Sequence, residues 1–196
     1  MDTRPSLDTA VLGGGCFWCL DAVFRELDGV HEVESGYAGG NGARPTYESV
    51  CSGRTGHAEV VRVAFDPSKI AYADLLGVFF AIHDPTTKNR QGHDIGTQYR
   101  SVIFAQDDAQ RDVASALVRR LEAERIFPGP IVTEIAGPAT FWPAEAYHQD
   151  YFSANPAQPY CLGVVAPKVA KFRKHFIDAV QVGLCGLHLR NIHVTP

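Results

Sequence analysis

Three consecutive glycines at positions 13–15 separate two segments with different hydrophobic patterns. Residues 9–12 form a short apolar run that predicts a strand. From residue 17 to residue 27, apolar side chains recur at helical spacing, and Gly29 predicts the end of that helix. The pattern therefore predicts a strand, a tight glycine turn and a helix that begins at Cys16.

The position of Cys16 predicts a reactive thiol. The first N–H groups of a helix have no partner within the helix, and the helix dipole favours an anion there. Such a site lowers the pKa of a cysteine and makes it a nucleophile. The alternative is a buried structural cysteine. A phosphate-binding loop is disfavoured, because no Lys-Ser/Thr follows the glycines and the G-x-G-x-x-G spacing is absent.

A second cysteine follows in the run Cys16-Phe17-Trp18-Cys19. One C-x-x-C pair is half of a zinc site, but a second close pair is missing. Cys51, His57 and Cys161 do not supply the spacing of metal ligands. We therefore predict redox chemistry with no bound metal or other cofactor.

Composition narrows the functional class. The chain has 196 residues, a formal net charge of -4 and five cysteines, an odd number that argues against a disulfide framework. The densest basic stretch, residues 168–174, is interpreted as a solvated helix face, so no nucleic-acid partner is expected. No apolar run approaches the ~20 residues that cross a membrane, and the polar N-terminus does not resemble a secretory signal. The expected location is cytoplasmic.

Strand-like and helix-like segments alternate irregularly along the chain, which favours a mixed sheet over a doubly wound parallel sheet. We predict an α+β two-layer sandwich with a ferredoxin-like core plus extra helices. Residues 1–177 are expected to form a single catalytic reductase domain, and residues 178–196 a C-terminal tail of unknown role. The expected strands are 9–12, 30–37, 58–65, 101–104 and 131–135, and the expected helices are 17–27, 47–51, 72–82, 107–125, 144–152 and 169–177, with loops at 36–45 and 83–96.

Six motifs resemble the peptide-methionine sulfoxide reductases of the A type, in order and at family-like separations over residues 10–177. They are GGGCFWC at 13–19, SGYAGG at 35–40, YESVCSGRTGHAE at 47–59, HDPTTKNRQGHDIGTQYRS at 83–101, AEAYHQDYF at 144–152 and PYC at 159–161. Two classes of enzyme reduce methionine sulfoxide, one for each epimer. The resemblance implies the S epimer, both free and protein-bound, and a monomeric enzyme.

The resemblance assigns roles to individual residues. Cys16 is implied to attack the sulfoxide sulfur, Glu59 to protonate the oxygen, Tyr37 and Tyr99 to donate hydrogen bonds to it, and Asp94 to organise the site. Glu59 also opens an apolar strand, where burial raises the pKa of a carboxyl and retains its proton. Considered without its motif, Glu59 has a second interpretation, a strand residue that forms an ion pair.

Two aromatic residues are implied to line the pocket for the substrate methyl group. Phe17 and Trp18 are neighbours on a helix, so their side chains diverge by ~100° and cannot both face one core. An aromatic wall suits a sulfur-bearing side chain. His148 falls within a matching motif and has no predicted role.

The reaction implied by the resemblance leaves Cys16 as a sulfenic acid, which a second cysteine converts to a disulfide. Thioredoxin, or dithiothreitol in vitro, then reduces the enzyme. Cys161 matches the common resolving position and is the preferred resolving thiol. Cys19, which is nearer and stands where the family usually has glycine, is the alternative. Cys51 is interpreted as a small buried residue, and Cys185 lies in the tail.

Two other functions fit parts of the pattern. A thioredoxin-like thiol-disulfide oxidoreductase would need only Cys16-Phe17-Trp18-Cys19 and not Glu59. A non-enzymatic metal-binding protein would hold zinc through Cys16.

Overall fold

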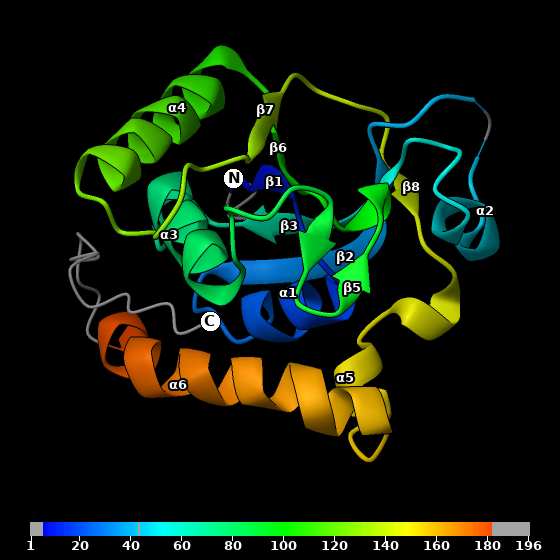
Figure 1. Ribbon diagram of the computed structural model, residues 1–196. Coiled ribbons are helices and arrows are strands. Elements are labelled where there is room, and N and C mark those ends of the chain that lie inside the picture. The colour runs from blue at the N-terminus through cyan, green and yellow to red at the C-terminus, as the bar shows by residue number, and fades with distance from the viewer. Residues whose placement is uncertain (1–5, 43, 182–196) are drawn as a thin grey trace.

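A computed structural model of the chain describes residues 6–42 and 44–181 (Figure 1). Six strands form one sheet in the order β7-β6-β1-β3-β2-β8, and two short strands pair separately. The strands are β1 (Asp8–Gly14), β2 (Val30–Ala38), β3 (Ala58–Phe65), β4 (Arg90–Gln91), β5 (Asp94–Ile95), β6 (Ser101–Phe104), β7 (Glu134–Ala136) and β8 (Trp142–Pro143).

The helices differ widely in length and type. The α-helices are α1 (Phe17–Phe24), α2 (Tyr47–Cys51), α3 (Tyr72–Ile82), α4 (Asp108–Ala123), α5 (Tyr151–Ala154) and α6 (Ala166–Gln181). Two 3₁₀ turns cover Thr97–Tyr99 and Ala146–His148, and a π-helical segment, Cys161–Val165, runs directly into α6.

The centre of the sheet has ferredoxin-like topology. The elements β1, α1, β2, β3, α3 and β6 occur in this order along the chain, with α2 and the β4–β5 hairpin as insertions. Their strands lie in the sheet in the order β6-β1-β3-β2, and all neighbours are antiparallel. β7 adds to the edge beside β6 in parallel, so the sheet is mixed. The predicted α+β sandwich with a mixed sheet is confirmed.

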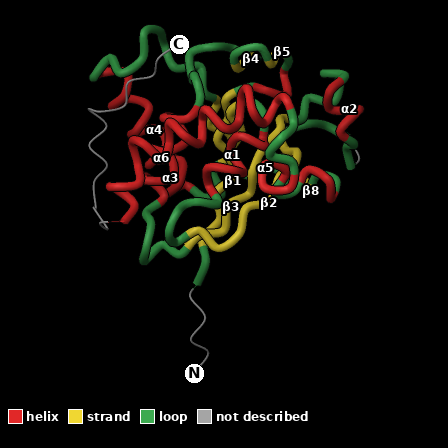
Figure 2. Tube along the Cα trace, turned by 90° about the horizontal axis from the view of Figure 1, so that it is seen from below, coloured by secondary structure: helices red, strands yellow, loops and turns green. Residues whose placement is uncertain are grey.

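The helices cover one face of the sheet. Alternation along β1 sends Ala10 and Leu12 into the main core, which they share with α1, α3, α4 and α6. Val11 points to the other face, where a smaller cluster is covered by Ala139 and Phe141 from the segment between β7 and β8. Figure 1 shows α1 and α6 beneath the strands, and the view from below shows the helices gathered over the sheet (Figure 2).

Several boundaries differ from the predictions. The predicted helix 144–152 is interrupted, because Asp150 adopts a left-handed conformation with φ of 47° between the 3₁₀ turn and α5. The predicted loop 83–96 contains the β4–β5 hairpin, and the strand predicted at 131–135 is β7, Glu134–Ala136. α6 continues to Gln181, and the rest of the predicted tail, with Cys185, lies outside the described residues.

None of the helices within residues 6–42 and 44–181 combines the length and apolar character needed to cross a bilayer.

Candidate active site

Gly13 and Gly14 end β1, and Gly15 turns the chain so that Cys16 lies directly before α1. Gly15 has φ of +92°, a conformation that favours glycine, and a Cβ on Gly13 would lie 2.8 Å from the backbone oxygen of Glu59. Cys16 is the N-cap of α1, as the sequence predicts, and its side chain is 7% exposed.

Glu59 lies on the neighbouring strand β3, beside the N-terminus of this helix. Its Oε2 accepts a hydrogen bond from the backbone N–H of Phe17 at 3.1 Å. Burial raises the pKa of Glu59 to about 8, although the Phe17 N–H opposes the rise. The predicted elevation of this pKa is confirmed, and the carboxyl retains its proton at neutral pH.

The predicted lowering of the Cys16 pKa is wrong. Burial raises the pKa of Cys16 well above its ordinary value, and the neighbouring Cys19 and Glu59 raise it further. The physical reason is visible at the helix start. The Phe17 N–H that would have stabilised a thiolate is bonded to Glu59 instead, and a buried thiolate loses its hydration.

Cys19 is the thiol paired with Cys16 across the first turn of the helix. Its backbone N–H donates to the Cys16 carbonyl at 3.1 Å, and its side chain is 1% exposed. Hydrogen bonding to Cys16 lowers the pKa of Cys19, burial opposes this, and the Lys168 ammonium lowers it again. Residues 168–174 are therefore not only a solvated helix face, because Lys168 is half-buried beside Cys19.

The two predicted tyrosine donors lie in different hydrogen-bonding environments. The Tyr37 hydroxyl donates to Glu145 Oε2 at 2.8 Å, and Glu145 Oε1 accepts the Tyr47 backbone N–H at 2.9 Å. The Tyr99 hydroxyl has no hydrogen-bond partner among the residues that the structure describes. Burial, with Glu145 beside Tyr37 and Glu59 near Tyr99, raises both hydroxyl pKa values, so both remain protonated donors.

Asp94 is connected to the thiols through Tyr160. Asp94 Oδ2 accepts a hydrogen bond from the Tyr160 hydroxyl at 2.7 Å. Tyr160 is also adjacent to Cys16, where its hydroxyl opposes the rise in the Cys16 pKa. Sequence reasoning missed Tyr160 and Glu145 as site residues, although both lie within matched motifs, PYC and AEAYHQDYF.

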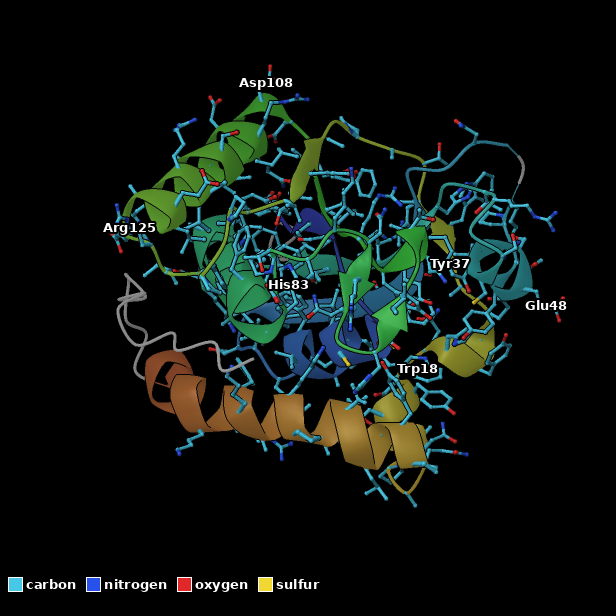
Figure 3. The ribbon with its side chains drawn as sticks, viewed as in Figure 1. Trp18, Tyr37, Glu48, His83, Asp108 and Arg125 are labelled. Atoms are coloured by element: carbon cyan, nitrogen blue, oxygen red, sulfur yellow. The ribbon has the colours of Figure 1, made fainter. Side chains whose placement is uncertain are left out.

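The prediction that the adjacent aromatics cannot both face one core is wrong: their ring centroids lie 6.4 Å apart, both contact His148, and Trp18 packs against the main core that contains Phe17. Phe17 is buried, with its ring centroid 5.8 Å from Tyr37 and 5.0 Å from His148. Trp18 is half-buried, stacks on Tyr151 with centroids 3.7 Å apart, and donates from Nε1 to His148 Nδ1 at 3.2 Å. This bond fixes the proton of neutral His148 on Nε2, which is buried and has no partner among the described residues. Figure 3 places Trp18 beside α1 and α5, and Tyr37 near α2.

The remaining described cysteines differ in exposure. Cys161 is buried at the start of the π-helical segment, and burial followed by the charge of Cys19 raises its pKa. The prediction that Cys51 is buried is wrong, because Cys51 ends the five-residue helix α2 at the surface and is exposed. Its sulfur hydrogen-bonds to Tyr47.

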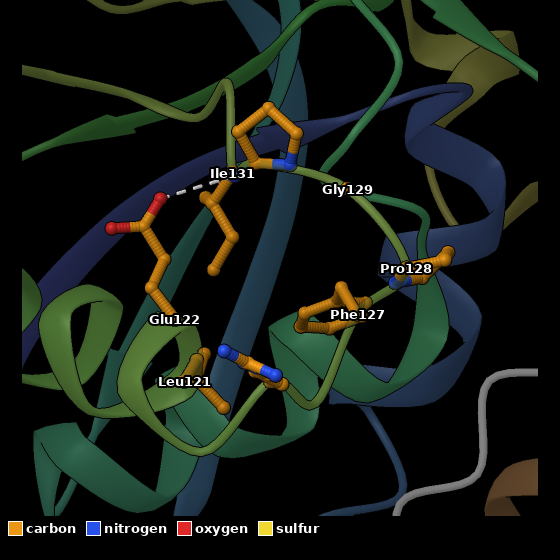
Figure 4. Close-up of a pocket in the computed structure, with 8 residues that line it drawn as sticks. Leu121, Glu122, Phe127, Pro128, Gly129 and Ile131 are labelled. Atoms are coloured by element: carbon orange, nitrogen blue, oxygen red, sulfur yellow. Dashed lines mark hydrogen bonds between the residues drawn. The ribbon is translucent and has the colours of Figure 1, made fainter.

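Within residues 6–42 and 44–181, no three His, Cys, Asp or Glu side chains are grouped as a metal site would require. A pocket of about 330 Å³ lies at the C-terminal end of α4, lined by Leu121, Glu122, Arg125 and residues 127–131 (Figure 4). It contains none of the predicted site residues.

A buried pair of thiols, one of them beside a carboxyl that keeps its proton, is the arrangement of a thiol-dependent oxidoreductase. The family model described as peptide methionine sulfoxide reductase matches residues 8–180. The chain belongs to the peptide methionine sulfoxide reductase family, whose members reduce methionine sulfoxide.

Individual relatives agree with this assignment. The chain is 57% identical over 185 residues to the MsrA of Ralstonia nicotianae, covering 92% of this chain and 97% of that protein. Among solved structures, reduced Mxr1 from Saccharomyces cerevisiae is 34% identical with a TM-score of 0.74, covering 82% of this chain and 94% of that one. Methionine sulfoxide reductase A of Corynebacterium diphtheriae is 34% identical with a TM-score of 0.70, covering 81% and 79%.

Proposed function

We propose that the enzyme reduces the S epimer of methionine sulfoxide, free and protein-bound, with Cys16 as nucleophile and Glu59 as general acid. The observation that carries this proposal is the Glu59 carboxyl, which is bonded to the first N–H of the Cys16 helix and has a pKa of about 8. A sulfoxide oxygen must be protonated as its bond to sulfur breaks, and the Glu59 carboxyl holds a proton beside the Cys16 helix start.

In the first step, the Cys16 sulfur attacks the sulfoxide sulfur while Glu59 protonates the oxygen. Tyr99, whose hydroxyl has no hydrogen-bond partner among the described residues, donates a hydrogen bond to that oxygen. Tyr37 donates a second one once its hydroxyl turns away from Glu145. The sulfoxide sulfur gains two electrons and leaves as methionine. The protonated oxygen passes to the Cys16 sulfur as the transient bond between the two sulfurs breaks, so Cys16 loses two electrons and becomes a sulfenic acid. The Cys16 thiol proton passes to the Glu59 carboxylate and restores the acid.

In the second step, we propose that Cys19 resolves the sulfenic acid before Cys161 does. Its thiol lies one helical turn from Cys16 and already contacts it, and the Lys168 ammonium beside Cys19 favours the thiolate that attacks. The new S–S bond expels the sulfenic oxygen as water. Cys161 is buried and its pKa is raised, so it is the less reactive of the two.

A thioredoxin is the proposed reductant. Its dithiol would attack the Cys16–Cys19 disulfide, take up the disulfide bond and release two enzyme thiols. Mxr1 from Saccharomyces cerevisiae is also known in complex with Trx2, which supports a partner of this type. A thioredoxin-reduced compartment such as the cytoplasm is the proposed location.

The direct test separates the two epimers. Incubation with each epimer of free methionine sulfoxide and dithiothreitol should consume the S form and form methionine, while the R form remains. Chiral chromatography of the residual sulfoxide measures both. Persistence of the S form would contradict the proposed function.

Cysteine variants should identify the resolving thiol. We expect Cys19→Ser to lose at least about tenfold in thioredoxin-dependent turnover, because the sulfenic acid then has no adjacent thiol. Each enzyme molecule should still form one methionine in a single turnover without reductant. Cys161→Ser is the matched variant and should form the same first disulfide as the wild type. Peptide mass mapping after one turnover reads the pairing, and a Cys16–Cys161 bond in the wild type would contradict this order.

A further inference from the structure

Lys168 is a charged residue on the buried side of α6. Val165 lies three residues before it and Phe172 four residues after it, and both belong to the main core with exposed fractions of 0% and 3%. Residues at these separations share one face of a helix. Lys168 is accordingly half-buried, on the part of the chain where α6 lies alongside α1 (Figure 1).

The packing of α1 against α6 directs the Lys168 side chain toward the thiols. Tyr160, just before the π-helical segment, is adjacent to Cys16 at one end of the pair. Arg173 forms an ion pair with Glu26 at 2.7 Å at the other end, so the two helices run in the same direction. Side chains on a helix tilt toward its N-terminus, and Lys168 therefore reaches back toward the start of α1.

Among the described groups that face Cys19, Lys168 carries the positive charge. Its ammonium lies beside the Cys19 thiol, and it forms no ion pair with an Asp or Glu of residues 6–42 and 44–181. An ionised acid would repel a thiolate, whereas a cation favours it. The other titratable groups that face Cys19 are acids, namely Cys16 on its own helix, Glu59 on β3, Asp94 on β5, and Tyr160 and Cys161 where the π-helical segment begins.

We propose that Lys168 stabilises the Cys19 thiolate in both halves of the catalytic cycle, so that Cys19 attacks the oxidised Cys16 and later leaves when a dithiol attacks Cys16. This inference rests on the proposed function and adds a positioning residue to it, since Lys168 acts through Cys19 and not on the substrate. It also fixes which sulfur the reductant attacks.

The first half is the resolution of the sulfenic acid. The Cys16 thiol, which lowers the pKa of Cys19 in the reduced enzyme, has been consumed by then, and Lys168 remains. The Cys19 thiolate gives an electron pair to the Cys16 sulfur, the S–S bond forms and the S–O bond breaks. The hydroxide takes a proton from the Glu59 carboxyl and leaves as water, and the proton that Cys19 released restores that carboxyl.

The second half is the reduction of the Cys16–Cys19 disulfide. A reductant thiolate attacks the Cys16 sulfur and forms a mixed disulfide, and the electron pair of the broken S–S bond leaves with Cys19 as a thiolate. A thiol of lower pKa leaves faster, and the Cys16 side chain is 7% exposed against 1% for Cys19. Leaving group and accessibility therefore select the same sulfur. The second thiol of the reductant then releases Cys16 and takes up the disulfide bond.

The test compares Lys168→Met, which removes the charge, with Lys168→Arg, which keeps it. Lys171→Met is the matched control, because Lys171 is also half-buried but lies further along α6, away from the thiols. Each protein is oxidised with one equivalent of the S sulfoxide, or with hydrogen peroxide, which forms the same sulfenic acid. Acid quench and mass spectrometry then follow disulfide formation at a series of pH values.

We expect Lys168→Met to form methionine at the wild-type rate but to form the disulfide about three- to tenfold more slowly near neutral pH, because less Cys19 is ionised. The deficit should disappear at high pH, where Cys19 is ionised without help. A merely structural role would leave the deficit at every pH. Lys168→Arg and Lys171→Met should stay within about twofold of the wild type.

The site of reductant attack is read from the mixed disulfide with a thioredoxin whose second active-site cysteine is replaced by serine. Peptide mass mapping should place the link on Cys16. A link on Cys19, a first disulfide between Cys16 and Cys161, or a wild-type rate of disulfide formation in Lys168→Met near neutral pH would each overturn the inference. Failure of the proposed function is distinct, since the wild type would then form no methionine from the S sulfoxide, while peroxide would still start the disulfide step.

Discussion

Replacement of Cys16 by serine should abolish reduction of methionine sulfoxide, with kcat/KM lower by at least about 10⁴-fold. Serine fills nearly the same volume at the start of α1, so the helix and its Glu59 bond should persist. A hydroxyl is a far weaker nucleophile than a thiol and cannot form a sulfenic acid or a disulfide. The measurement is methionine formation with dithiothreitol, together with the thermal unfolding midpoint of the variant.

Cys51→Ser is the matched control for the loss of a thiol. Cys51 is exposed at the end of α2 and hydrogen-bonds to Tyr47 rather than to the other described cysteines. Its replacement should leave kcat/KM within about twofold of the wild type, as is usual for surface changes of small effect on stability. Substantial turnover by Cys16→Ser, at an unchanged unfolding midpoint, would remove Cys16 from the mechanism.

Replacement of Glu59 by glutamine should lower kcat/KM by about 10²–10⁴-fold, the usual contribution of a general acid. The amide oxygen of glutamine can still accept the Phe17 N–H, so the helix start is preserved. What is lost is the acidic proton. The effect should therefore appear in turnover and not in the unfolding midpoint.

The pH dependence of kcat/KM tests the role of Glu59 independently. The protonated form of Glu59 is the active acid, and its pKa in the free enzyme is about 8. Its contribution to kcat/KM is therefore complete well below pH 8 and is lost as the pH rises through about 8. This descending limb should be absent from the profile of Glu59→Gln.

Glu34→Gln is the matched control for a strand glutamate. Glu34 lies on β2 and pairs with Arg62 at the surface, so its loss should leave both the rate and the descending limb unchanged. Sulfoxide reduction at full rate by Glu59→Gln would contradict the mechanism. It would favour chemistry that uses the Cys16-Phe17-Trp18-Cys19 thiols alone.

Local patterns predicted the framework of this protein well. The strand Ala58–Phe65 and the helix Tyr72–Ile82 have the predicted bounds, because each is mainly apolar and is bounded by clear end residues. The helix predicted over 144–152 did not hold as one element. Its spacing is helical, but Asp150 adopts a left-handed conformation that local periodicity does not encode.

Exposure of short motifs was less predictable. Cys51 lies in a matched motif and was expected to be buried, yet α2 turns the adjacent Val50 toward the core and leaves Cys51 exposed. Lys168 was expected to face solvent, and it lies beside Cys19 because the π-helical segment and α6 pack against α1. Both outcomes depend on how distant elements pack.

The sequence by itself determined that Cys16 begins a helix after a glycine turn, that Glu59 begins a buried strand, and that the motifs belong to one family. Only the tertiary structure decided the protonation at this helix start. The pairing of β1 with β3 brings the Glu59 carboxyl to the Phe17 N–H, which removes the donor that a Cys16 thiolate would have used. The pKa values of Cys16 and Glu59 are both raised, because desolvation depends on everything packed around a group and not on its neighbours in the chain.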